Sequence, residues 1–229
     1  NVLTGQRYNA LGFGLGGYGD PKDSDRYTQK FSLSYVTGSH SFKTGIYVEE
    51  VISNTGYRTH GDIQYRFAGA TPTTVEQFAT PFIARERLLP DLGLYAQDQW
   101  TIDRLTRNLG LRVDYIRGIV PAQDVPASQF VPARSYDAIT GVPNHWDLNP
   151  RFGLAYDLFG TGRTALKTTF GRYVNAMGTF DFTGLVAPNT VNPVIASVNN
   201  VSRTWSDANG NYHPDCDLNT LTANGECGQ

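Results

Sequence analysis

The chain has 229 residues, with 19 Lys and Arg against 21 Asp and Glu, and a formal net charge of -2 at pH 7. The chain therefore lacks the surplus of basic residues that a dedicated nucleic-acid-binding protein carries, and no nucleic-acid partner is expected. No apolar run reaches the roughly eighteen residues of a transmembrane helix, but alternating strands of a transmembrane β-barrel contain no such run either.

The first pair of predicted strands lies at 28–36 and 42–49, on either side of a tight turn at 38–40. In both segments apolar residues alternate with polar ones, the period of a strand with two different faces. The apolar positions are Phe31, Leu33, Tyr35, Phe42, Ile46 and Val48.

Two further pairs follow, at 92–102 with 109–115 and at 152–158 with 166–174. Their turns are Asp103-Arg104 and the segment 160–163, and Asp98 interrupts an otherwise apolar face. We predict that one face holds Leu94, Trp100, Leu109, Leu111, Val113, Phe152, Leu154 and Tyr156. The opposite face should hold Arg112, Asp114, Arg151 and Asp157, charges that suit a hydrated lumen.

Long connections are expected at 53–91, 118–149 and from 176 onward, and the charged run 85–87 in the first of them predicts a solvated loop or short helix. Short turns that alternate with long loops are typical of outer-membrane barrels. The predicted fold class is therefore all-β: an antiparallel up-and-down transmembrane β-barrel segment of about six to eight strands, with short turns on one side and long loops on the other. A soluble secreted β-sandwich binding module, with a calcium- or disulfide-stabilised loop, is the alternative, because alternation alone does not distinguish lipid from a packed core.

These segments resemble TonB-dependent outer-membrane receptors, and most closely the Oar-like group that has an N-terminal carboxypeptidase-regulatory-like domain. The resemblance rests on LGLYAQDQW at 92–100 and on its return strand LGLRVDY at 109–115, where Val113 replaces a commoner Tyr. Further similar segments lie at 149–157, 164–173, 203–218 and 224–228.

The resemblance implies a barrel of about 22 strands behind a plug domain. Residues 1–229 would then be part of one barrel domain, cut at both ends and without plug or TonB box, and 176–229 would be a long extracellular loop region. The implied function is nutrient uptake (siderophore, cofactor or glycan class) in the bacterial outer membrane. The implied partners are outer-membrane lipid, TonB through the missing plug region, and a small-molecule or glycan ligand.

No catalytic motif is present, so we do not expect an enzyme: the four histidines are isolated and no nucleophile elbow occurs. The tail holds a candidate calcium site, because oxygen donors recur there at alternating spacing. The donors are Asp207, Asn209, Asn211, Asp215 and Asp217. The alternative is a loop rich in Asx turns, whose side chains bond their own backbone. No cofactor is required, and calcium is the candidate ion.

The two cysteines, Cys216 and Cys227, both lie in this polar tail. Two cysteines in one loop and none elsewhere favour an oxidising compartment, so we predict that they form a disulfide. A zinc site is disfavoured, because zinc normally needs four ligands and only His213 is near.

Overall fold

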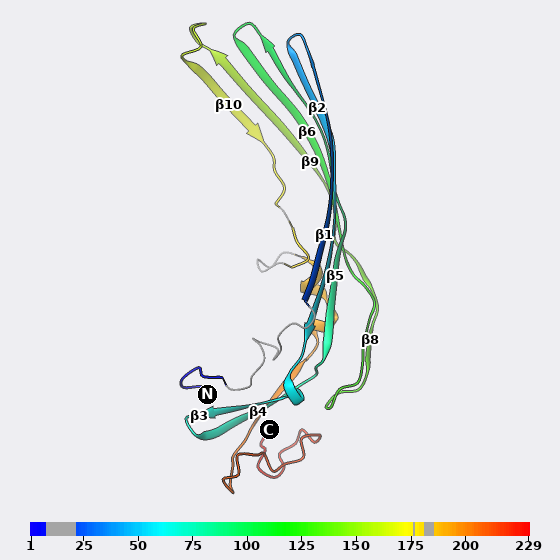
Figure 1. The fold of residues 1–229 in the computed structure, drawn as a ribbon, viewed down its shortest axis with the longest axis vertical. Coiled ribbons are helices and arrows are strands. Elements are labelled where there is room, and N and C mark those ends of the chain that lie inside the picture. The colour runs from blue at the N-terminus through cyan, green and yellow to red at the C-terminus, as the bar shows by residue number, and fades with distance from the viewer. Residues whose placement is uncertain (8–21, 176, 181–185) are drawn as a thin grey trace.

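The computed structural model describes residues 1–7, 22–175, 177–180 and 186–229. These residues form one long six-stranded sheet and two small sheets, all antiparallel. The long sheet is a single curved layer that runs most of the length of the molecule (Figure 1), and its edge strands are not paired with each other. In sheet order the strands are β1 (Lys22–Thr37), β2 (His40–Tyr57), β5 (Phe82–Ile102), β6 (Leu105–Val120), β9 (Ile139–Asp157) and β10 (Ala165–Gly171).

Three tight hairpins join these strands in pairs, and their turns lie together at one end of the sheet (Figure 1). The backbone N–H of Thr101 donates to Ser39 O at 2.9 Å, and that of Asp157 donates to Arg104 O at 2.9 Å. These bonds link the first turn to the second and the second to the third. The predicted grouping of the short turns on one side is therefore confirmed.

The register places the predicted apolar residues on one face of the sheet. Leu94 lies opposite Val113, and Leu109 lies opposite Phe152, because directly paired residues point to the same side. Arg112 and Asp114 alternate with these residues and share the other face with Arg151, which is paired with Gly110. The structure thus has an apolar outer face and a polar inner face, as predicted.

The apolar belt of the outer face is exposed and has no second layer over it. Phe170 is 69% exposed, Phe31 66% and Leu111 47%. In β9 the belt runs from Trp146 to Tyr156, about eleven residues, which at a barrel tilt spans roughly 25–30 Å. No second sheet packs on this face among the described residues, so the architecture is that of a membrane wall and not of a sandwich.

The prediction of a long loop at 53–91 is wrong. Strands β2 and β5 stay paired down to Tyr57 and Phe82, well beyond the belt, and a hairpin of β3 (Ile63–Ala68) and β4 (Thr71–Phe78) lies between them. The run 85–87, expected as a solvated loop or helix, lies within β5, and Glu86 is only 3% exposed. The polar residues of this segment form backbone hydrogen bonds with a strand about thirty residues away in the sequence. Local composition does not reveal such a pairing.

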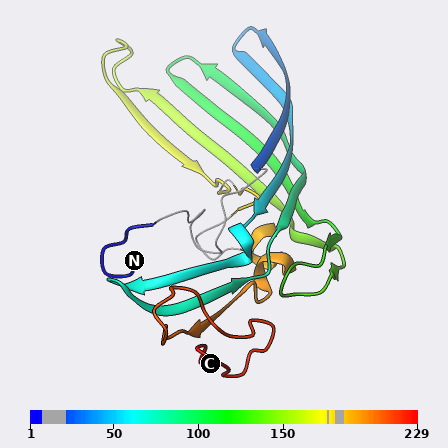
Figure 2. The same ribbon diagram turned by 60° about the horizontal axis from the view of Figure 1, so that its bottom comes forward.

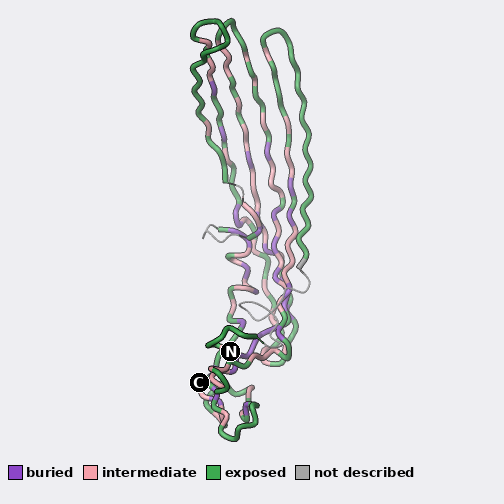
Figure 3. Tube along the Cα trace, turned by 60° about the vertical axis from the view of Figure 1, so that its left-hand side comes forward, coloured by how far each residue is buried: buried purple, intermediate pink, exposed green. Residues whose placement is uncertain are grey.

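Buried residues gather in this extension, at the end remote from the short turns (Figure 3). One cluster contains Val75, Trp205 and Cys227, and another contains Phe82, Val125 and Val194. The remaining elements lie here as well (Figure 2): η1 (His60–Asp62), β7 (Gln123–Val125), β8 (Arg134–Tyr136), α1 (Pro188–Val191), α2 (Pro193–Ala196) and β11 (Asn200–Thr204). Within the described ranges, no helix has the length and apolar character to cross a membrane.

Leu111→Arg tests whether the outer face contacts lipid. We expect it to lower the free energy of unfolding by about 2–4 kcal/mol, since a cation near the bilayer midplane loses its hydration. The measurement is urea unfolding of the full-length protein in lipid vesicles. Gln97→Arg is the matched control, because Gln97 lies one position away in depth on the inner face, opposite Gly110. Equal losses in the two variants would contradict lipid contact at Leu111.

Candidate functional site: the inner face and the outer extension

A band of acidic side chains crosses the inner face of the sheet. Glu49 lies opposite Asp91, and Asp114 lies opposite Asp147. Most of this negative charge is compensated locally. Arg112 pairs with Asp114 at 2.7 Å, Arg172 with Asp147 at 2.5 Å and Arg26 with Glu49 at 3.5 Å.

Further polar groups tie the band together. The Tyr47 hydroxyl donates to Glu49, and Thr28 donates to the same carboxylate at 3.0 Å. The Asn149 amide donates to Asp114 Oδ2 at 2.8 Å, and Asn149 itself is only 1% exposed. The inner face is therefore an ordered polar surface, in which Glu49, Asp114 and Asp147 have hydrogen-bond partners.

Glycines leave room for long side chains to lie across this surface. A Cβ at Gly93 would lie 2.7 Å from Arg112 Cζ, and one at Gly45 would lie 2.7 Å from the ring of Tyr95. The side chains of Arg112 and Tyr95 thus cross the neighbouring strand where it has no side chain of its own. This packing keeps the Arg112 guanidinium against Asp114.

A cavity of about 280 Å³ opens on the inner face beside this band. Its wall is mixed: the sheet supplies charged groups, and the segment after β10 supplies an apolar side. The lining residues are Tyr47, Asp91, Arg112, Asp114, Ile116, His145, Asp147, Val174, Asn175 and Met177. Such a cavity offers hydrogen bonds and charge to a polar ligand.

Beyond the band, a short helical segment covers the inner face. A β-bulge between Leu88 and Asp91 shifts the alternation, so that Glu86 shares the inner face with Asp91. Asn192, which caps α2, donates its amide to Glu86 Oε1 at 2.7 Å and accepts from Gln123 at 3.0 Å. This buried network fixes α1 and α2 to the wall.

Glu86 lies outside the apolar belt, in the extension. Burial raises the pKa of its carboxyl, while hydrogen bonds from Asn192 and Ser53 and the nearby Arg87 oppose the rise. Because the folded state disfavours the ionised form, this group contributes more to stability as the pH falls and less as the pH rises through its raised pKa. Sequence reasoning missed the network, since Asn192 lies 106 residues from Glu86 and 69 residues from Gln123.

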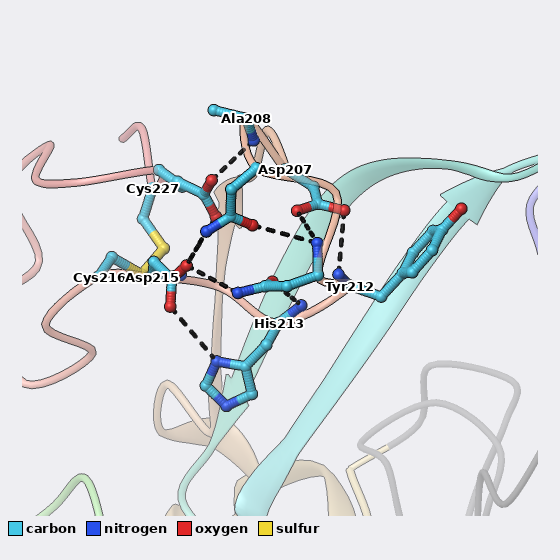
Figure 4. Close-up of polar contacts among 10 residues, drawn as sticks. Asp207, Ala208, Tyr212, His213, Asp215, Cys216 and Cys227 are labelled. Atoms are coloured by element: carbon cyan, nitrogen blue, oxygen red, sulfur yellow. Dashed lines mark hydrogen bonds and ion pairs between the residues drawn. A yellow bond between two sulfur atoms is a disulfide. The ribbon is translucent and has the colours of Figure 1, made fainter.

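The predicted calcium ligands do not all come together. Asp207 accepts from the backbone N–H groups of Asn211 and Tyr212, both at 3.0 Å, and Asp215 accepts from the amides of Asn209 and Asn211 (Figure 4). Asp217 lies in a separate turn, where the Thr220 hydroxyl and the Asn219 N–H lower its pKa.

These bonds follow the Asx-turn alternative. In the part of the chain that the structure describes, no three His, Cys, Asp or Glu side chains are arranged to hold a metal ion. Calcium binding stays a prediction.

A disulfide joins Cys216 and Cys227, the two residues predicted to form one, with their Cα atoms 5.8 Å apart. Beside it lies Arg203, which is 2% exposed and donates three hydrogen bonds to backbone carbonyls. The acceptors are Gly228 O at 3.1 Å, Asp217 O at 3.4 Å and Thr222 O at 2.8 Å. The covalent link and the buried guanidinium together hold the tail against β11.

A family model described as an outer membrane beta barrel domain matches residues 3–225. No curated protein and no solved structure matches the chain.

Gly93→Ala should disturb the inner face, because the new methyl group would displace the Arg112 guanidinium from Asp114. We expect a loss of about 1.5–3 kcal/mol, the range for a hydrogen bond to a charged group. The measurement is again urea unfolding of the full-length protein in vesicles. Gly110→Ala is the control, because its nearest contact is Gln97 Cβ at an ordinary 3.5 Å. A Gly93→Ala variant as stable as Gly110→Ala would contradict this packing.

Reducing the disulfide should loosen only the tail. By the chain-entropy model, closure of a loop of this size contributes about 2–3 kcal/mol, and here to a segment with little apolar mass of its own. Hydrogen exchange in 206–229 should therefore accelerate in Cys216→Ser, while exchange in β6 and β9 stays slow. Two alkylatable thiols in the unreduced protein, or unchanged exchange in the variant, would contradict the role of the disulfide.

Proposed function

Because the chain belongs to the family of outer membrane β-barrel domains, we propose that it is part of the barrel of a TonB-dependent receptor for nutrient uptake. The protein lies in the bacterial outer membrane, with the apolar belt toward lipid. The hairpin of β5 and β6 carries the sequence similarity to such receptors.

The observation that carries the proposal is the ordered charged surface on the inner face, together with the cavity that opens on it. Carboxylates on the inner face would be costly in a dry interior even when they are paired, because both charges of each pair lose their hydration. A hydrated lumen that conducts a polar solute explains them. The ligand classes that fit are siderophores, cofactors and glycans, all rich in hydrogen-bonding groups.

The parts of the chain have different roles in this proposal. The sheet supplies the wall, and α1 and α2 narrow the lumen on the side away from the short turns. The disulfide-closed tail belongs to the extracellular surface that first meets the ligand. The chain performs no catalysis, and TonB acts through a plug region outside residues 1–229.

The test is uptake by the native bacterium under nutrient limitation. Cells with and without the gene for the full-length protein are offered a siderophore mixture, a corrinoid cofactor and an oligosaccharide mixture, each isotopically labelled. We expect the gene to be needed for accumulation of one class, and a protonophore to abolish that accumulation.

A passive channel would give accumulation that depends on the gene but not on the proton gradient, and that result would contradict the TonB-dependent mechanism. Arg112→Gln, which opens the ion pair with Asp114 on the inner face, should lower uptake. Leu111→Val on the outer face is its control and should leave uptake unchanged. If cells with and without the gene accumulated all three ligand classes equally, that result would contradict the proposal altogether.

A further inference from the structure

Near the short turns, the outer face carries charged groups where apolar ones are expected. Asp98 lies opposite Phe42 on one side and Leu109 on the other, so it belongs to the face with the apolar belt. Its Oδ2 accepts from His40 Nδ1 at 2.7 Å. Its Oδ1 is buried, so the carboxylate offers no open acceptor to a cation.

The His40 ring is held on both sides by aromatic rings. It stacks on Phe42 with centroids 5.2 Å apart and on Trp100 with centroids 5.1 Å apart. The bond from Nδ1 to Asp98 and the two ring contacts together fix the orientation of the imidazole. Trp100 has an amphipathic ring, the kind enriched where a barrel leaves the lipid.

Arg107 adds a positive charge beside this group. It lies opposite Trp100 in the ladder, on the outer face, and its Cζ is 5.2 Å from the centre of the Trp100 ring. No carboxylate is within ion-pair distance of its guanidinium in the described part of the chain. An uncompensated cation is therefore held in a fixed position at the edge of a lipid-facing belt.

A partly exposed guanidinium at the edge of an apolar belt is stabilised by a nearby anion. The anions at the edge of a bilayer are the phosphates of lipid headgroups. A planar guanidinium binds a phosphate through two parallel N–H bonds. Phe42, Leu109 and Phe152 continue from this point along the outer face, where an acyl chain would lie.

We propose that Arg107, held over the Trp100 ring, binds the phosphate of a glycerophospholipid in the leaflet next to the short turns, while His40 and Asp98 hold the Trp100 ring in place from the other strand. The site recognises a phosphodiester through the Arg107 guanidinium and the acyl chain through the belt. The proposal rests on the orientation of the sheet in the membrane, and not on the proposed transport activity.

The experiment is native mass spectrometry of the full-length protein, purified in detergent and given dioleoyl phosphatidylglycerol at a fixed ratio. We expect one tightly held lipid, and loss of it in Arg107→Gln. Lys43→Gln is the control, since it removes the same charge from the inner face, opposite Gln97 and three residues along β2 from His40. Heat-modifiable migration on a gel verifies that each variant is folded.

Arg107→Lys keeps the charge and gives a second measurement. Its lipid should dissociate at a lower collision energy than that of the parent, because an ammonium meets the phosphate at a single point. Equal lipid retention by Arg107→Gln and the parent would overturn the site. Displacement of the lipid by inorganic phosphate alone, or retention of lipid A in place of glycerophospholipid, would overturn the assignment of the ligand. Nutrient uptake should be unchanged in the two Arg107 variants, which separates this test from that of the transport proposal.

Discussion

The wall of the protein depends on one constraint, that every backbone N–H and C=O inside a bilayer must find a partner within the protein. The ladders from β1 to β10 satisfy this condition along six strands. They also fix the register, and the register alone decides which side chains face lipid. The outer edges of β1 and β10 have no strand partner among the described residues.

The same constraint explains why the two ends of the sheet are built differently. Inside the belt, lipid takes the place of a core, and residues such as Leu111 and Phe170 stay exposed. Beyond the belt water surrounds the sheet, and apolar groups must then be buried against other parts of the chain. The clusters around Val75 and Phe82, the α1–α2 segment and the disulfide all lie in that region.

The parts of the fold that depend on residues close together in the sequence could be predicted from the sequence alone. Alternation assigned the faces of Leu94, Leu111 and Arg112 correctly, and the short polar turns located the three hairpins. It failed at 53–91, because Ser, Asn and Arg occur both in loops and in ladders that extend into water. Whether such a segment pairs depends on a strand some thirty residues away.

The candidate site shows the same division between local and distant information. The pairing of Arg112 with Asp114 is local, since the two lie two residues apart on one face. The contact of Glu86 with Asn192 joins positions separated by 106 residues, and no periodic pattern links them. Polar groups that are buried by distant segments cannot be distinguished by composition from those that stay in water.

The distribution of charge between the two faces bears on where a ligand would be selected. On the inner face Glu49, Asp114 and Asp147 already have arginine partners, so a charged ligand there must compete with formed ion pairs. Competition of that kind gives a surface that a polar solute can cross without being trapped. In the proposed receptor, tight selection then belongs to the extension, where Arg203 and the disulfide hold the tail in a defined shape. A rigid loop loses less conformational entropy when it binds than a flexible one does, which favours affinity at the entrance over affinity along the wall.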